Sequence, residues 1–324
     1  MKRPRNIWHK LWYLAQAVPA YAVYGVMRAL PLSITAPACA SVLRTIGPML
    51  PVSNVARENL RLAYPEKSAA ERARILRGVW DNLGRLAGEY MHLDDLWDDG
   101  LFDASDRVGL KRLIEMAERG EPARLATDRL EVVGAENFIR LLIGEGPALM
   151  FAPHVANFEL LPFGAGKFGV YTAVVFRTPN NPYVARLIHR IRSGLGDLLP
   201  KGLEGAVAAA RVLEEGGRVG MLVDQKHNRG IPVPFFGRPA MTAPTVAKLA
   251  LRYGAPIYGA CVHRTGPGRF RITVTPPLKL PTEGDEDAKV ARIMADINAV
   301  CEAWVREAPE QWLWLHRRWP KKTK

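Results

Sequence analysis

The sequence predicts an α/β fold, in which a mostly parallel central sheet is flanked by helices and ends in an antiparallel edge hairpin. Three observations lead to this fold class. From Leu130 onward, short apolar runs of strand length alternate with segments whose apolar residues recur at helical spacing. Near the end of this region, Gly266-Pro267-Gly268 separates two strand-like runs, which is a hairpin signal. Before this region, two long apolar stretches predict an N-terminal helical segment that anchors the chain to a membrane.

The anchor is expected in residues 1–52, and one further domain in residues 53–324. The stretch from Leu11 to Met27 carries no charge, follows a basic start and is rich in tryptophan and tyrosine, which settle at headgroup depth. It is close to the lower limit for spanning a bilayer. The basic start favours a cytoplasmic N-terminus, so a single span would export the rest of the chain. A monotopic or re-entrant anchor therefore suits a cytoplasmic active site better. A buried pair of core helices is the alternative.

The elements that follow are predicted in order. A capping box at Ser68-Ala69-Ala70-Glu71 starts a helix whose apolar positions continue to Tyr90. The acidic turn at 94–99 lacks metal-ligand spacing and is expected to be a solvated loop. The strands are expected at 130–133, 147–151, 171–176, 218–223, 256–262 and 270–275. The helices between and after them are expected at 135–143, 182–191, 202–214, 244–252 and 285–306.

Composition narrows the classes of function. The 324 residues are 48% hydrophobic and 24% charged, which excludes wholesale disorder. The net charge of +13 and the pI near 9.9 favour an anionic partner, which could be nucleic acid, an acidic membrane face or a phosphorylated substrate. The basic residues are scattered and no nucleic-acid motif is present, which argues against nucleic acid. Three widely spaced cysteines argue against a disulfide framework or a cysteine zinc site and favour a reducing compartment.

The chemistry is expected around Phe151-Ala152-Pro153-His154-Val155-Ala156-Asn157-Phe158-Glu159. His154 lies where a strand ends and a helix begins, the place where α/β sheets put their sites. Asn157 is a candidate helix cap, and Glu159 is expected in the first helical turn, where it could fold back on the imidazole. A carboxylate on one ring nitrogen would leave the other free to take a proton from a hydroxyl. The alternative is a capping histidine beside an unrelated surface glutamate.

Three further polar stretches follow predicted apolar strands. Arg177 and Asn180 follow the strand ending at 176, and Asp224-Gln225-Lys226 follow the strand ending at 223. Arg238 closes a proline-aromatic loop, Val233-Pro234-Phe235-Phe236-Gly237-Arg238. Taken singly, none of these stretches is informative, and an arginine after a strand is more often in a surface ion pair. Together they predict a site along the carboxyl edge of one sheet.

This combination resembles the late acyltransferases of lipid A biosynthesis, the lauroyl and myristoyl transferases within the glycerolipid acyltransferase superfamily. His154 and Glu159 match the H-x4-D/E box, and 176–182 match the arginine box. Further matches are 199–202, 222–226, 233–239 and the closing segment through His316-Arg317-Arg318. Two features depart from the wider superfamily. Glu159 stands where Asp is more usual, and Asp224-Gln225-Lys226 replaces a Glu-Gly-Thr box, which argues against a glycerol-3-phosphate acceptor.

The resemblance implies acyl transfer from a thioester, usually on acyl carrier protein, to a hydroxyl of an anionic lipid A precursor at the cytoplasmic side of the inner membrane. It implies His154 as general base, Glu159 as its orienting partner and Arg177 as oxyanion or phosphate ligand. The implied substrate-binding residues are Asn157, Asn180, Asp224, Gln225, Lys226 and Arg238. Neither a cofactor nor a metal is expected. Residues 53–324 would then be the acyltransferase domain.

Several alternatives stay open. The enzyme could use acyl-CoA to acylate another glycolipid or an aminolipid, or the chain could be a basic, non-catalytic protein that binds membrane or nucleic acid. Arg186, Arg190 and Arg192 would suit an anionic acceptor or an acidic carrier protein, or form an ordinary solvated face. The C-terminal tryptophans with Arg317 and Arg318 suit either a membrane interface or a core with a basic tail. These tryptophans are Trp312, Trp314 and Trp319.

Overall fold

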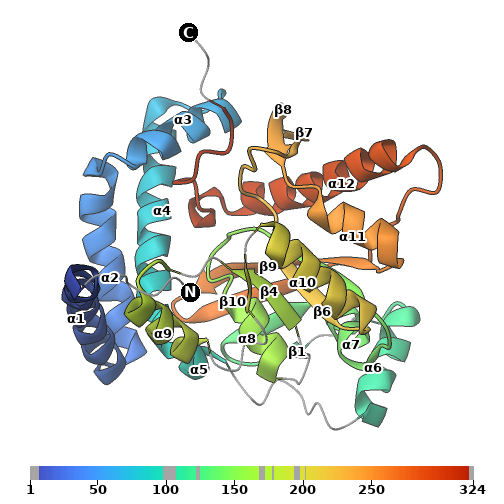
Figure 1. Cartoon of the computed structure of the whole chain (residues 1–324), viewed down its shortest axis with the longest axis horizontal. Coiled ribbons are helices and arrows are strands. Elements are labelled where there is room, and N and C mark those ends of the chain that lie inside the picture. The colour runs from blue at the N-terminus through green and yellow to red at the C-terminus, as the bar shows by residue number, and fades with distance from the viewer. Residues whose placement is uncertain are drawn as a thin grey trace.

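The computed structural model describes residues 7–97, 107–121, 125–167, 172–176, 179–192, 198–200 and 202–320. Within this part of the chain, an eight-stranded sheet has the strand order β1-β2-β10-β9-β3-β6-β4-β5 (Figure 1). Its strands are β1 (Leu125–Ala126), β2 (Leu130–Val133), β3 (Ala148–Ala152), β4 (Thr172–Phe176), β5 (Leu198–Pro200), β6 (Arg218–Leu222), β9 (Ile257–Gly266) and β10 (Arg269–Val274). The predicted α/β class is therefore confirmed.

Most neighbouring strands run parallel. β3 pairs in parallel with β6 on one side and with β9 on the other. The antiparallel edge of the sheet is the short strand β1, which pairs with β2. The predicted hairpin across Gly266-Pro267-Gly268 also forms, because β9 and β10 are antiparallel. That hairpin lies inside the sheet, since β10 pairs in parallel with β2 on its other side.

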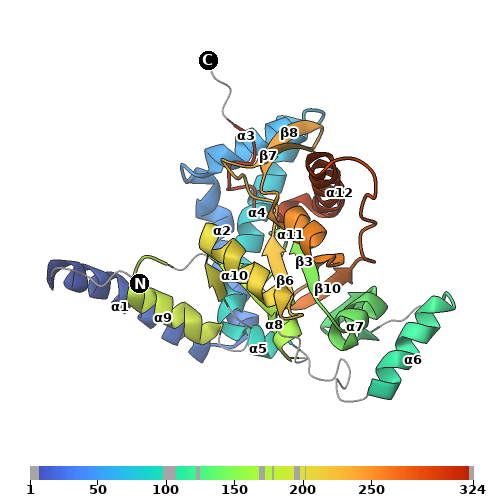
Figure 2. The same ribbon diagram turned by 45° about the vertical axis from the view of Figure 1, so that its right-hand side comes forward.

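Helices cover both faces of the sheet. Against one face lie α7 (Ala135–Ile143) and α8 (Leu160–Lys167), while α11 (Thr245–Tyr253) and α12 (Glu286–Glu307) lie against the other (Figure 2). On that second face Trp304 of α12 packs on Phe151 of β3, with ring centroids 6.1 Å apart. Gly259 permits this approach, because a Cβ there would lie 2.7 Å from Phe151 and 2.8 Å from Trp304. α10 (Leu203–Glu214) lies against the β4–β6 half, α9 (Pro182–Ile191) packs against the N-terminal helix Ile7–Ala29, and α6 (Arg107–Glu118) contacts α7.

The N-terminal helices form a layer beside the sheet (Figure 1). They are α1 (Ile7–Ala29), α2 (Leu32–Ile46), α3 (Ser53–Ala63) and α4 (Ala69–Glu89), followed by η2 (Tyr90–His92) and α5 (Leu93–Leu96); η1 (Gly47–Met49) joins α2 to α3. The predicted capping box is confirmed at the start of α4, where Ser68 and Glu71 exchange both bonds. α2 packs closely on α4, since a Cβ at Gly84 would lie 2.5 Å from the Cα of Ala40.

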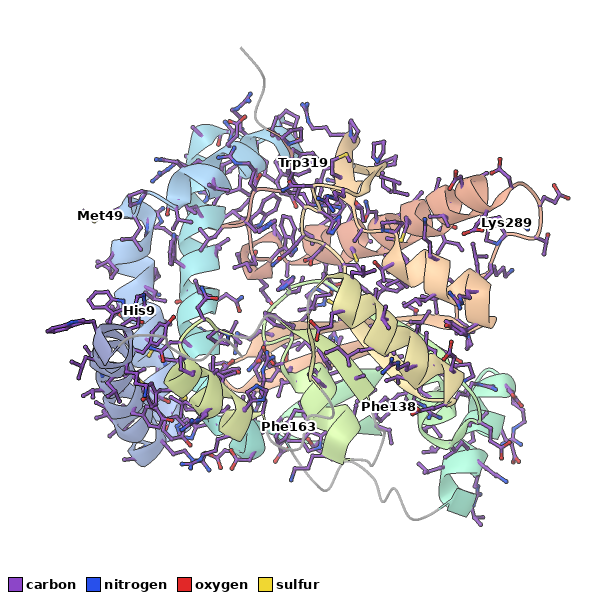
Figure 3. All side chains as sticks on the ribbon, in the orientation of Figure 1. His9, Met49, Phe138, Phe163, Lys289 and Trp319 are labelled. Atoms are coloured by element: carbon purple, nitrogen blue, oxygen red, sulfur yellow. The ribbon has the colours of Figure 1, made fainter. Side chains whose placement is uncertain are left out.

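The outer side of this layer is apolar and exposed. Trp8 is 72% exposed and Met49 is 82% exposed, and Figure 3 shows Met49 at the outer edge of the layer. Across the described ranges, we find no helix with both the length and the apolar character needed to cross a bilayer. The spanning form of the predicted anchor is therefore not found. The interfacial form and the boundary at residue 52 stay predictions.

In the C-terminal half, the structure corrects one prediction and decides between two alternatives. The proline-aromatic loop is a separate hairpin of β7 (Ile231–Phe235) and β8 (Arg238–Thr242), outside the main sheet. Its turn residues Phe236 and Gly237 both have positive φ, as two-residue turns of type I′ require. The C-terminal tryptophans belong to the core rather than to a membrane interface. Trp312, Trp314 and Trp319 are 3%, 0% and 4% exposed.

Candidate active site

His154 lies in the loop between β3 and α8, as predicted. Glu159 directly precedes α8, and its carbonyl oxygen accepts the N–H of Phe163, so it ends the loop rather than joining the first helical turn. Within the loop, Ala156 has a φ of 45°, a left-handed conformation that costs a non-glycine residue roughly 1 kcal/mol. The surrounding contacts therefore hold this loop in one shape against its local preference.

The register of the sheet brings His154 to Asp224. Ala152 of β3 is paired with Leu222 of β6, and each functional residue stands two positions beyond its paired residue. The His154 Nδ1 lies 2.6 Å from Asp224 Oδ1, and the His154 main-chain N–H donates to Asp224 Oδ2 at 2.7 Å. The carboxylate that meets the imidazole is thus Asp224, which the sequence placed among substrate-binding residues, and not Glu159.

The neighbours of the ring fix its tautomer. Because the Asp224 carboxylate can only accept, Nδ1 carries the proton, and Nε2 is left with its lone pair. The Gln225 side-chain Nε2 lies 3.2 Å from His154 Nε2, where an amide N–H can donate to that lone pair. This tautomer is the one a general base needs, since the free lone pair is the proton acceptor.

Asp224 stays ionised in spite of its burial. Its side chain is 1% exposed, and burial alone would raise its pKa, but the imidazole and hydrogen bonds from His154 and Trp312 lower that pKa to about 2. The Trp312 indole N–H donates to Asp224 Oδ2 at 2.6 Å. Each of the two Asp224 carboxylate oxygens therefore has a donor, which is the arrangement that stabilises a buried carboxylate.

Glu159 is paired with a different partner from the one predicted. Its carboxylate binds the Arg192 guanidinium, and Arg192 Nε also donates to the Tyr90 hydroxyl at 2.9 Å. Both side chains of the ion pair are buried, at 7% and 9% exposure. Burial raises the pKa of Glu159, while Arg192 and the nearby His154 oppose that rise. The expected Glu159–imidazole hydrogen bond is replaced by this buried ion pair.

An apolar cavity of about 540 Å³ opens beside the ring of His154. Its floor is one face of the sheet, because the register places every second residue of six strands on that side. Those floor residues are Val132, Met150, Ala152, Val174, Gly220, Leu222, Ala260, Ile272 and Val274. Its roof includes Phe138 of α7, Leu161 of α8 and Trp97. The polar lining residues are His154, Glu159, Arg192, Gln225 and His316.

The predicted substrate-binding residues are dispersed. Asn157 is fully buried and donates to Glu89 Oε2 at 3.0 Å, so it supports the loop instead of facing a substrate. Asn180 is exposed, whereas its neighbour Asn181 caps α9. Lys226 is half-buried beside the site loop. Arg238 is exposed on the separate hairpin and donates to the Leu62 carbonyl at 3.0 Å, which corrects its predicted place at the sheet edge.

Other site residues were missed or cannot be placed. Arg177 lies outside the described residues, so its predicted role stays a prediction. For Arg192 the sequence predicts either an anion ligand or a solvated helix face, and no local signal marks it as the partner of Glu159. Trp312 was recognised only as one of a cluster of tryptophans. Within the described ranges, no group of three or more His, Cys, Asp and Glu residues is placed to hold a metal ion.

The chain is similar to known proteins over most of its length. The family model described as bacterial lipid A biosynthesis acyltransferase matches residues 11–321. The lipid A biosynthesis palmitoleoyltransferase of Escherichia coli K12 is 26% identical over 277 residues, covering 82% of this chain and 78% of the relative. The lauroyltransferase of the same organism is 26% identical over 274 residues, with the same shares covered. A lipid A biosynthesis acyltransferase of Shigella flexneri is also 26% identical.

Proposed function

This chain belongs to the bacterial lipid A biosynthesis acyltransferase family, and we propose that it moves a fatty acyl chain from an acyl thioester to a hydroxyl of a lipid A precursor. The proposal is carried by one observation: the His154–Asp224 pair stands at an apolar cavity with its Nε2 lone pair directed away from the carboxylate. A base beside an apolar cavity suits a reaction between an alcohol and a fatty acyl thioester.

The reaction begins with the acceptor hydroxyl. His154 Nε2 takes the hydroxyl proton as the oxygen attacks the thioester carbonyl, and Asp224 balances the imidazolium that forms. The tetrahedral intermediate then collapses, the carbon–sulfur bond breaks, and the imidazolium returns the proton to the departing thiolate. The products are an ester and a free thiol. Asp224 thus takes the orienting role that the sequence suggested for Glu159.

Direct attack fits the cysteines as well. Cys261 and Cys301 are fully buried, and burial raises the pKa of each thiol well above its ordinary value. A buried neutral thiol is a poor nucleophile, because the thiolate is the reactive form. We therefore propose transfer without a covalent acyl-enzyme.

Gln225 stands where the acceptor hydroxyl must bind. Its amide is 3.2 Å from His154 Nε2, and a substrate hydroxyl approaching that lone pair would displace it. The displaced N–H would lie next to the reacting carbonyl and could donate to the oxyanion. Arg177 remains the other candidate for that role. The buried Glu159–Arg192 pair would form the wall of the site, and the fatty chain would lie along the apolar floor.

The N-terminal layer is the candidate membrane surface. Exposed tryptophans and aliphatic side chains of α1 and α2 form an apolar face, with Trp8 at 72% and Trp12 at 63% exposure. Together with the net charge of +13, this face suits interfacial binding to an anionic bilayer. We propose that the enzyme lies on the inner membrane with its site facing the cytoplasm. Flotation with anionic vesicles should carry wild-type protein, and replacing Trp8, Trp12 and Met49 with Ser should release it.

The activity test uses purified protein, a lipid A precursor and one donor at a time. With acyl carrier protein as the donor, we expect the lipid to gain the mass of one acyl group less the single hydroxyl hydrogen that it replaces. Acyl-CoA in place of acyl carrier protein tests the alternative donor, and a glycolipid or aminolipid in place of the precursor tests the alternative acceptor. His154→Ala should abolish transfer while the protein keeps its circular dichroism spectrum. No mass gain with any donor would refute the proposed function.

A further inference from the structure

A short segment near the C-terminus lies directly against the His154 loop. This segment, Gln311–Leu313, is called the C-terminal strap here; it follows α12 and begins at the last residue of η3 (Pro309–Gln311). The Gln311 carbonyl accepts the N–H of Ala156 at 2.9 Å, and the Leu313 N–H donates to the His154 carbonyl at 3.1 Å. The strap therefore brackets the strained Ala156 and fixes the backbone that carries the proposed base.

The strap is itself held by rigid elements. The Gln311 side chain bonds the main chain of Arg264 in β9 twice, accepting from its N–H at 2.7 Å and donating to its carbonyl at 3.0 Å. Asn82 of α4 donates to the Gln311 carbonyl at 3.1 Å. Figure 1 shows the red C-terminal chain turning back toward α4 after α12. Sheet and helix together set the position of the strap.

Trp312, at the centre of the strap, reaches the carboxylate of the pair. Its indole N–H and the His154 main-chain N–H both donate to Asp224 Oδ2, at 2.6 and 2.7 Å. With one oxygen held in this way, Oδ1 faces His154 Nδ1 at 2.6 Å. The indole ring cannot easily turn away, because Trp314 packs edge-on against it with centroids 4.5 Å apart and Phe235 lies at 5.7 Å.

We propose that Trp312 is a positioning residue for acyl transfer, whose indole N–H holds the Asp224 carboxylate so that it fixes the tautomer and orientation of His154. This inference rests on the proposed function, since it assigns Trp312 to the same reaction. Trp312 is 3% exposed and is absent from the cavity lining, so it acts through Asp224 without touching the substrate. The C-terminal strap is then part of the active site, although it lies more than 150 residues from His154 in the sequence.

The first test removes the donor and keeps an aromatic ring. Trp312→Phe should lower kcat about tenfold to a hundredfold, which is a part of the rate enhancement that a positioned general base contributes. KM should change less than about twofold, because the substrate contacts remain. The acidic limb of the pH–rate profile, which follows protonation of the proposed base, should move to higher pH. Losing a donor raises the pKa of Asp224 and leaves more negative charge on the oxygen that faces the ring, and this charge favours the protonated imidazole.

A matched control separates positioning from simple loss of stability. Trp80 is also a buried indole, and its N–H donates to Ser53 Oγ at 2.9 Å in the N-terminal layer, away from Asp224. Trp80→Phe should lower the melting temperature and leave kcat and the pH–rate profile unchanged, when both are measured below the melting range of every variant. An equal kcat loss in both variants would show that Trp312 has only a structural role.

A double-mutant cycle gives the decisive result. In the Asp224→Asn background there is no carboxylate for Trp312 to hold, so adding Trp312→Phe should lower kcat by less than about threefold. The same large drop in both backgrounds would overturn the inference, as would a Trp312→Phe variant with wild-type kcat. A wild-type enzyme that transfers no acyl group would instead refute the proposed function, so the two failures are distinguishable.

Discussion

The imidazole of His154 has both ring nitrogens engaged, Nδ1 by Asp224 at 2.6 Å and Nε2 by the Gln225 amide at 3.2 Å. Asp224 is buried, and the charge of the His154 imidazole together with three accepted hydrogen bonds lowers its pKa to about 2 although burial would raise it. Single side chains therefore decide the chemistry here: a carboxylate fixes the tautomer, and an amide marks the place that a substrate hydroxyl would take.

The buried pair Glu159–Arg192 gives a prediction at this scale. Glu159→Gln leaves the Arg192 charge buried without its partner, which should reduce the free energy of unfolding by about 3–5 kcal/mol. The double variant Glu159→Gln/Arg192→Met should recover much of that loss, because no unpaired charge remains. Denaturant unfolding measures both. The exposed pair Glu58–Arg61 is the control, since Glu58→Gln should barely shift the midpoint. A double variant as unstable as the single one would contradict the explanation.

Among the elements, the packing of α2 on α4 depends on small residues. A Cβ at Gly88 would lie 2.7 Å from the Cα of Ala36, one turn along from the contact of Gly84 with Ala40. The two helices therefore meet backbone to backbone. This contact supports the end of α4, where the buried Glu89 receives the Asn157 amide of the His154 loop.

Paired glycine substitutions test this packing. Gly84→Ala should destabilise the protein by about 1–3 kcal/mol, because overpacking against the α2 backbone outweighs the better helix propensity of alanine. Gly25→Ala in α1 meets no atom within 4 Å, so it should cost nothing and favour its helix by up to about 1 kcal/mol. Thermal unfolding of the two variants gives the comparison. Equal effects would mean that the close α2–α4 contact does not matter for stability.

The elements also show how far the sequence alone could lead. Hydrophobic period and capping residues located β2, α7 and α9 to the residue and β3, β6, α10 and α12 to within one residue. The spacing of hydrophobic residues could not reveal that the β9–β10 hairpin lies inside the sheet, because the order of the strands depends on pairing between segments far apart in the sequence. The β7–β8 hairpin was missed since three prolines in Ile231–Thr242 argue against a strand, although an isolated hairpin has free edges that tolerate them.

The site was predictable where it depends on single strand ends. His154 and Asp224 were both selected because each follows an apolar strand, yet their pairing depends on β3 and β6 being neighbours in register. Spacing along the chain favoured Glu159, five residues away. The contacts of Arg192 and Trp312 come from distant segments, and neither residue type identifies its partner. Local pattern therefore gave the candidates, and topology selected the pairs.

At the scale of the whole molecule, acid stability follows from Asp224. In the folded protein the pKa of Asp224 falls from its ordinary value near 3.8 to about 2. The ionised carboxylate therefore stabilises the folded state at pH values above its ordinary pKa, and this stabilisation is lost as the pH falls toward 2. The loss amounts to about 2 kcal/mol. Unfolding free energies of wild type and Asp224→Asn, measured between pH 5 and pH 2 (roughly the window set by this shift), should converge as pH falls. A constant difference across that range would contradict the shift.

The central claim is that the His154–Asp224 pair, assembled by two parallel strands and the C-terminal strap, is the base that drives acyl transfer. Its most direct test is the initial rate of acyl transfer to the lipid A precursor by Asp224→Asn, measured beside wild type and the variant Asp287→Asn, which changes an exposed residue in the first turn of α12. The amide would face Nδ1 with its NH₂ group and force the wrong tautomer, so kcat should fall about 10³–10⁴-fold, while Asp287→Asn keeps the wild-type rate. An Asp224→Asn enzyme within about threefold of wild type, a difference of under about 1 kcal/mol in the barrier, would contradict the account.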